Sequence, residues 1–164
     1  MKTVLIVRHA KSAPADVGQS DFERSLNKRG KEDSMEMAKR ISKEIDRIDA
    51  FISSPAKRAR KTAERFITQY GITKEELILV PSLYEAGVND FYEVVENLDD
   101  SFKTIALFSH NPGITDFANS QNCINIFNMP TGSVFAFQID TDKWSHMKIA
   151  ERKLLFFFLP KDEE

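Results

Sequence analysis

Short apolar runs of strand length alternate along the chain with segments of helical spacing, and this alternation constrains the fold more than any other feature. The first run, "TVLIV" at residues 3–7, is continuously apolar, as in a strand covered on both faces. Similar runs follow in "DAFIS", "LILVP" and "TIALFS". Because helical patterns separate these runs, the sequence predicts an α/β fold, a three-layer α/β/α sandwich around a mainly parallel sheet.

The expected helices have recognisable starts. Asn27 is a candidate N-cap before a stretch in which apolar residues recur at helical intervals up to Ile48. A second helix is expected over residues 54–70, with Ser54 as candidate N-cap and Pro55 at the first helical position. The stretch "DFYEVVENL" and the segment that follows "NPG" predict two further helices.

The last quarter of the chain has a different pattern. "SVFAFQID" and "MKIAERKLLFFFLP" predict two strands joined by the turn "DTDKW", which adds an antiparallel edge to the sheet. With 164 residues, 41% hydrophobic and 29% charged, and no linker or repeat, the chain matches one globular domain. We therefore expect a single domain over residues 1–164.

Composition excludes several classes of partner. The 23 basic and 25 acidic residues give a net charge of -2, which does not favour nucleic acid or an anionic membrane. The first apolar run stops at Arg8, too early for a secretory signal, and no segment approaches the roughly 18 apolar residues of a membrane span. A single cysteine, Cys123, cannot form an internal disulfide. We expect a soluble protein of the reducing cytoplasm.

Charged and polar residues follow the expected parallel strands at their carboxyl ends. The first strand is followed by Arg8 and His9, and the second by a helix that carries Arg58. The third leads into a loop with Glu85, and the fourth is followed by His110. Because ligands of open α/β sheets bind outside the carboxyl ends of the strands, we expect these side chains to share one site.

The residue types at this site favour an anion. Two guanidinium groups, two imidazoles and helix N-termini all attract negative charge, and arginine matches phosphate oxygens in a bidentate manner. Two fixed cations would repel a divalent metal, and the chain has no His-x-x-x-His or Cys-x-x-Cys pair. The sequence therefore predicts a phosphoryl-binding site with no metal or other cofactor.

These residues lie in motifs that resemble the histidine phosphatase superfamily, in particular its small branch of SixA-like phosphohistidine phosphatases. "RHA" at residues 8–10 resembles the Arg-His-Gly signature, and "DFERSLNKRG" resembles Asp-x-x-Arg-x-Leu-x-x-x-Gly. "SSPAKRARKTA" and "SHNP" are similar to Ser-Pro-x-x-Arg-x-x-x-Thr and Ser-His-x-Pro, in the family's order. The resemblance spans about residues 4–113 and implies a phosphoglycerate mutase-like fold.

The resemblance also implies a mechanism. His9 would attack phosphorus as a neutral imidazole and form a phosphohistidine, which water then hydrolyses. Arg8, Arg58 and a protonated His110 would hold the non-bridging oxygens in the transition state. Neighbouring positive charges would keep the nucleophile neutral by lowering its pKa.

Two further residues have less settled roles. Glu85 occupies the family position of the general acid, but it could instead orient water or contact substrate, because a phosphohistidine can leave as imidazole with its own proton. The larger family has an asparagine at the place of Ala15. Its phosphate contact is either unfilled or taken over by Ser12, whose alternative role is a simple turn.

The short segment between His110 and the terminal strands predicts an open pocket entrance. Such an entrance suits phosphohistidine on a protein, for example a phosphotransfer or carrier domain. Two alternatives are a phosphatase of small phosphate monoesters and a module that binds phosphoryl groups without turnover.

Overall fold

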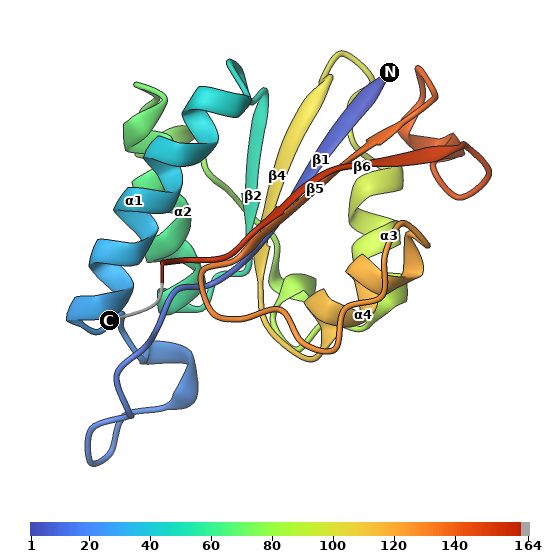
Figure 1. The fold of residues 1–164 in the computed structure, drawn as a ribbon. Helices are drawn as coiled ribbons and strands as arrows, with labels where there is room; N and C mark the ends of the chain where they lie inside the picture. The colour runs from blue at the N-terminus through green and yellow to red at the C-terminus, as the bar shows by residue number, and fades with distance from the viewer. Residues whose placement is uncertain (162–164) are drawn as a thin grey trace.

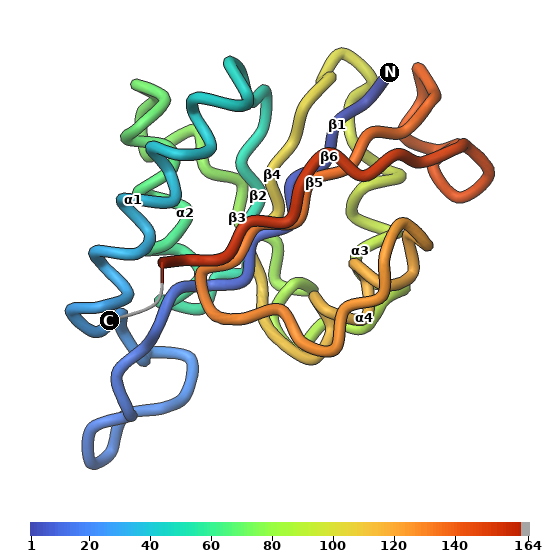
Figure 2. Tube along the Cα trace, in the orientation of Figure 1, coloured from blue at the N-terminus to red at the C-terminus, as the bar shows by residue number. Residues whose placement is uncertain are grey.

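A six-stranded sheet forms the centre of the protein, for which a computed structural model describes residues 1–161. The sheet order is β3-β2-β4-β1-β5-β6 (Figures 1 and 2). The strands are β1 (Lys2–Arg8), β2 (Ala50–Ser53), β3 (Ile78–Leu79), β4 (Thr104–Ser109), β5 (Val134–Ile139) and β6 (Arg152–Phe158). The first four pair in parallel, whereas β5 and β6 are antiparallel to their neighbours. The predicted mainly parallel sheet with an antiparallel edge is confirmed.

Two helices cover each face of the sheet (Figure 1). Helices α1 (Lys28–Glu44) and α2 (Lys57–Gln69) lie on one face, and α3 (Val88–Glu96) and α4 (Gly113–Ser120) lie on the other. Short 3₁₀ helices span Asp21–Glu23, Lys74–Glu76, Pro81–Leu83 and Trp144–His146. Within residues 1–161, none of the helices is long and apolar enough to cross a membrane.

The central strand β1 is apolar at every inner position because it has a helical layer on both sides. Val4 and Ile6 pack into the core that includes α3 and α4, whereas Leu5 and Val7 pack into the core of α1 and α2. All four side chains are fully buried, and each burial stabilises the fold by about 1.5–3 kcal/mol.

The structure differs from the sequence predictions at two connections. The stretch "LILVP" contributes only the two-residue strand β3, which lies at the sheet edge with both side chains exposed. The β5–β6 connection is longer than the predicted turn because the chain folds back to bury Trp144 in the core. The antiparallel pairing of the two strands is nevertheless as predicted.

Helix α1 packs directly against the loop that follows β1. Asn27 caps the helix as predicted, since its side chain accepts a hydrogen bond from the Gly30 N–H at 2.8 Å. The Asn27 N–H donates to the carbonyl of Lys11 at 3.0 Å. A Cβ atom at position 30 would overlap this same carbonyl oxygen. Only glycine therefore allows α1 to hold the loop in place.

Gly30→Ala should destabilise the fold by about 1–3 kcal/mol because the added methyl group must displace the Lys11 backbone. Within a helix, alanine is normally more stabilising than glycine by about 0.5–1 kcal/mol. A decrease in the free energy of unfolding would therefore be opposite to the change that helix propensity alone predicts. Urea unfolding measures the change. As a control, Gly87→Ala adds a methyl group that meets only a carboxylate oxygen at 3.8 Å, and it should cost under about 1 kcal/mol. A stabilised Gly30→Ala variant would contradict the prediction.

Candidate active site

The two histidines of the predicted site lie side by side because β1 and β4 are adjacent and in register. Arg8 pairs with Ser109 at the ends of the two strands, and the His9 N–H donates to the Ser109 carbonyl at 3.1 Å. His9 and His110 are therefore the residues that immediately follow β1 and β4. Their ring centroids lie 5.1 Å apart.

A pocket of about 450 Å³ opens at this edge of the sheet. It brings together five of the six predicted site residues and several that the sequence did not single out. The lining residues are Arg8, His9, Lys11, Ser12, Arg24, Asn27, Arg58, His110, Asn111 and Thr131.

Glu85 is the predicted site residue that does not line the pocket. Its side chain is exposed, and its backbone lies in the left-handed region with φ of 58°. The residue of this loop that packs against the site is Tyr84, whose ring contacts His110 edge-on at 5.5 Å. The loop therefore contributes an aromatic wall instead of the predicted carboxyl group.

His9 has the protonation state that a nucleophile requires. Its Nδ1 atom lies 2.7 Å from the Ala10 carbonyl oxygen. Because a carbonyl can only accept, Nδ1 carries the hydrogen and Nε2 keeps its lone pair. Burial, with the charges of Arg58 and Arg8, lowers the pKa of His9 to about 4. The imidazole is therefore neutral at pH 7.

His110 is held by Ser54, which lies just beyond β2. The Ser54 hydroxyl oxygen accepts from the Ala56 N–H at 3.2 Å and lies 2.8 Å from His110 Nε2. If Ser54 donates its proton to Nε2, the hydrogen of the neutral ring is on Nδ1. This Nδ1 atom is buried and has no hydrogen-bond partner among residues 1–161. In this tautomer Nδ1 can donate to an anion.

Without a ligand, the surroundings of His110 favour its neutral form. Burial, followed by the proximity of His9 and Arg58, lowers the pKa of His110 to about 3. A phosphoryl group in the pocket would oppose this effect, because a nearby negative charge favours the imidazolium form. The prediction of Ser54 as the N-cap of α2 is wrong, since Ala56 occupies that position.

Backbone carbonyls fix the orientation of both predicted arginines. Arg8 donates from Nη1 to the Met129 carbonyl at 2.7 Å, and its buried Nε has no partner among residues 1–161. Arg58 donates from Nη1 to the Asp21 carbonyl at 2.7 Å. Burial, with the charge of Arg58, lowers the pKa of Arg8. An unpaired buried donor costs about 1–3 kcal/mol, so the Arg8 Nε favours an acceptor in the pocket.

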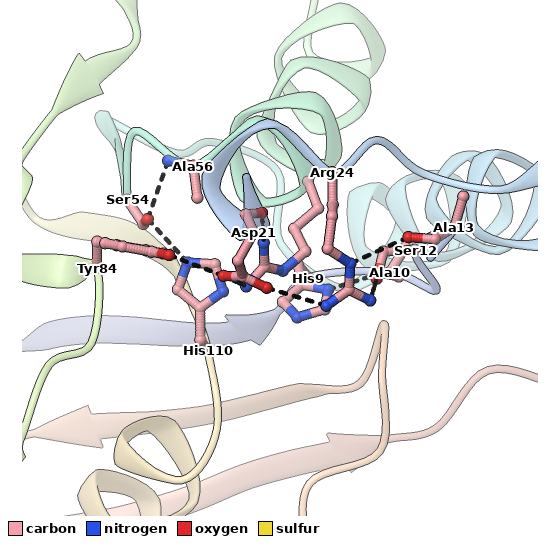
Figure 3. A network of polar contacts seen from close by, with 11 residues as sticks. His9, Ala10, Ser12, Ala13, Asp21, Arg24, Ser54, Ala56, Tyr84 and His110 are labelled. Carbon is pink, nitrogen blue, oxygen red and sulfur yellow. Dashed lines mark hydrogen bonds and ion pairs between the residues drawn. The ribbon is translucent and has the colours of Figure 1, made fainter. Parts of the chain in front are cut away.

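Asp21 is a carboxylate that links several walls of the pocket (Figure 3). Its Oδ2 accepts from the Tyr84 hydroxyl at 2.7 Å and from Arg58 Nη2 at 3.0 Å. Its Oδ1 accepts from Arg24 Nη1 at 3.0 Å. Hydrogen bonds from Tyr84 and the two arginines hold the pKa of Asp21 well below its usual range. Asp21 therefore stays ionised and orients the cations around it.

Arg24 places a third guanidinium at the pocket. It donates from Nη2 to the Ser12 hydroxyl at 2.8 Å and from Nε to the Ala13 carbonyl at 3.0 Å. Ser12 also pairs with Leu26 in an isolated bridge. Sequence reasoning did not assign Asp21, Tyr84 or Arg24 to the site. The motif "DFERSLNKRG" was the available signal for Asp21 and Arg24.

The structure is an α/β fold with a cationic pocket at the ends of its parallel strands. A neutral imidazole with a free lone pair lies among three guanidinium groups and a second imidazole that can donate. Such a set can attack phosphorus and stabilise the negative charge of its oxygens.

A family model for the histidine phosphatase superfamily (branch 1) matches residues 4–113, and the chain belongs to this superfamily. No curated protein sequence matches the chain.

Solved structures with the same fold include SixA proteins. A candidate phosphohistidine phosphatase SixA from Agrobacterium tumefaciens has 21% identity and a TM-score of 0.79, over 97% of this chain and 99% of the other. The protein histidine phosphatase SixA complexed with tungstate has 19% identity and a TM-score of 0.78, over 94% and 95%. A mycobacterial glucosyl-3-phosphoglycerate phosphatase has 13% identity and a TM-score of 0.72, over 95% and 98%. The predicted phosphoglycerate mutase-like fold is confirmed.

Both pocket histidines should remain neutral down to about pH 5, because their pKa values are lowered to about 4 for His9 and about 3 for His110. Nitrogen-15 NMR of the imidazoles would follow the two titrations, with His9→Asn and His110→Asn used for assignment. A midpoint near 6.5 for either ring would contradict the prediction.

The same shifts make stability depend on pH. A histidine has a pKa of about 6.5 in the unfolded chain, well above the pKa values of His9 and His110 in the folded protein. At a pH between these values, the unfolded chain therefore binds more protons than the folded protein. The stabilisation from these two residues is therefore complete above about pH 6.5 and is lost as the pH falls to about 4 for His9 and about 3 for His110. In urea unfolding over this range, the free energy of unfolding should depend less steeply on pH for His110→Asn than for the wild type.

Proposed function

We propose that the protein is a metal-independent phosphatase that acts through a covalent intermediate on His9, and that its substrate is phosphohistidine on a protein. The observation that carries the proposal is the hydrogen bond from His9 Nδ1 to the Ala10 carbonyl. This bond fixes the tautomer and leaves the Nε2 lone pair available within a cationic pocket. A module that only binds phosphoryl groups would not require this tautomer.

In the first step, His9 Nε2 forms a bond to phosphorus while the bond from phosphorus to the leaving imidazole breaks. The imidazole leaves neutral when its other ring nitrogen already carries a proton. Arg8, Arg58 and His110 hold the three non-bridging oxygens, with His110 taking up a proton as the phosphoryl charge raises its pKa. This arrangement stabilises the in-line transition state electrostatically.

In the second step, water attacks the phosphorus of the His9 intermediate. The new oxygen bond forms as the bond to Nε2 breaks, which releases phosphate and restores the imidazole. Arg24 lines the same pocket and is held by Ser12 and Asp21. We assign Arg24 the phosphate contact that Ala15 cannot make, with Ser12 as its support.

The choice of phosphohistidine over an ester depends on the leaving group. An alkoxide needs an acid, and Glu85 is not part of the pocket wall. An imidazole leaving group does not need a general acid when its other ring nitrogen carries a proton, so a site without an acid suits phosphohistidine better than an ester. The likeness to a mycobacterial glucosyl-3-phosphoglycerate phosphatase keeps small phosphate monoesters as the second candidate. The proposed partner is a phosphotransfer or carrier domain in the cytoplasm.

His9→Ala should abolish turnover and leave no covalent intermediate, because Nε2 is the attacking atom. A brief reaction with a labelled phosphohistidine peptide, followed by acid or alkali treatment of the protein, measures the intermediate. Label on the wild type should be lost in acid and survive alkali.

Two variants sharpen this test. His146→Ala alters an exposed histidine remote from the pocket and should keep full activity. Arg58→Ala should lower the rate by about 10² or more through lost transition-state stabilisation. Acid-stable label, or label that persists in His9→Ala, would overturn the assignment of His9.

Glu85→Gln should change kcat/KM for phosphohistidine by less than about twofold, because Glu85 does not line the pocket and imidazole can leave without an acid. Parallel assays with a phosphohistidine peptide and a sugar phosphate measure the difference. A loss on the sugar phosphate alone would show that Glu85 acts on that leaving group, and a loss on both substrates would contradict the prediction.

A further inference from the structure

Phe127 is a large aromatic side chain that the fold leaves in solvent. It lies in the segment between α4 and β5 and is 103% exposed, whereas Ile126 and Met129 on either side are buried. Figure 1 shows this segment in orange beside α4, at the end of the sheet where β1 and β4 finish. Aromatic residues are enriched at protein interfaces, so this exposed ring beside a binding pocket is a candidate contact for a partner.

Hydrogen bonds fix the backbone on both sides of Phe127. The side chain of Asn119 accepts from the Ile126 N–H at 2.7 Å and donates to its carbonyl at 2.8 Å. The Met129 N–H donates to the Thr115 hydroxyl at 3.0 Å. The aromatic ring is therefore presented from a fixed backbone, which reduces the entropy lost on binding.

A cavity of about 330 Å³, here called the docking cavity, lies beside Phe127. Its lining residues are Asn111, Pro112, Thr115, Asp116, Phe127 and Asn128. Asn111 also lines the phosphate pocket, so the two spaces are neighbours. Met129 connects them as well, because its carbonyl accepts from Arg8 Nη1 at 2.7 Å and from Asn111 Nδ2 at 3.3 Å.

The docking cavity differs from the phosphate pocket in its charge. Asp116 is exposed and has no salt bridge within residues 1–161. A carboxylate beside an aromatic ring suits a lysine or arginine side chain, through ion pairing and a cation–π contact. The phosphate pocket instead contains Arg8, Arg24 and Arg58. The two neighbouring spaces therefore fit a phosphoryl group and a basic side chain on one partner.

We propose that the docking cavity binds a basic side chain of the phosphorylated protein, close to its phosphohistidine, and that Phe127 and Asp116 determine this specificity. The proposal rests on the proposed function, since it names a feature of the same substrate. A free phosphohistidine cannot occupy both spaces, whereas residues three or four apart on a helix of the partner face the same side.

Synthetic peptides that contain one chemically phosphorylated histidine would test the proposal. A single lysine is moved along the peptide from four residues before the histidine to four residues after it, and a matched series carries glutamate instead. At one or two positions the wild type should prefer lysine over glutamate by about tenfold in kcat/KM. Phe127→Ala and Asp116→Asn should each remove most of this preference, and Asp116→Lys should reverse it.

Free phosphohistidine is the reference substrate, and its kcat/KM should change less than about twofold in these variants because it does not reach the docking cavity. Ile149→Ala and Asp142→Asn remove an exposed apolar and an exposed acidic side chain from the β5–β6 connection, at the opposite end of the sheet (Figure 1). Both controls should keep the lysine preference.

The outcomes separate the two proposals. If the wild type hydrolyses free phosphohistidine and all peptides without a charge preference, the docking proposal is wrong and the phosphatase proposal stands. If neither free phosphohistidine nor any phosphohistidine peptide is hydrolysed, both the phosphatase proposal and the docking proposal are wrong. Concentration-dependent dimerisation that Phe127→Ala abolishes, with unchanged peptide kinetics, would instead assign the cavity to a second copy of the chain and overturn the docking proposal.

Discussion

The parallel pairing of β1 with β4 is the constraint on which the rest of the site depends. Because Arg8 lies opposite Ser109, the chain leaves both strands at the same level, and His9 and His110 follow side by side. A shift of one residue in this register would turn the side chains of one strand to the opposite face. The apolar residues of β1, packed into two separate cores, would all resist such a shift. The stability of the core therefore maintains the geometry of the pocket.

This arrangement concentrates positive charge, and Asp21 is the main countercharge. It accepts hydrogen bonds from Arg24, Arg58 and Tyr84, which lowers the repulsion between the two guanidinium groups. The two imidazoles reduce the repulsion further by remaining neutral, as the direction of both pKa shifts shows. Within residues 1–161, the buried Arg8 Nε and His110 Nδ1 have no hydrogen-bond partner. An anionic ligand that accepted hydrogen bonds from these nitrogens would remove the free-energy cost of leaving them unpaired, which would favour binding.

Much of the fold could be predicted from the sequence because its local signals agree with one another. The apolar run of β1, the Asn27 cap and the alternation of strands with helices all indicate one architecture. The errors arise where tertiary contacts override local preference. Ser54 has the chemistry of an N-cap, but its hydroxyl bonds to His110 across the sheet edge. Glu85 follows its strand as expected, yet the left-handed backbone of its loop leaves Tyr84 against the site. Asp21 and Arg24 lie in a motif that the sequence shows, but their contacts with each other and with Arg58 depend on how the fold brings this loop to α2.

The division between the phosphate pocket and its surroundings explains how one superfamily fold can serve different substrates. Apart from Arg24, the groups proposed to contact phosphorus and its oxygens come from strand ends and helix α2, where the sheet limits their movement. The neighbouring residues come from connections such as the segment between α4 and β5, which can change without disturbing the strand register. Met129 belongs to both regions, since its backbone orients Arg8 while Phe127 and Asn128 beside it line the docking cavity. Substitutions of side chains on this segment can therefore alter the docking cavity while the backbone carbonyl that holds Arg8 is retained.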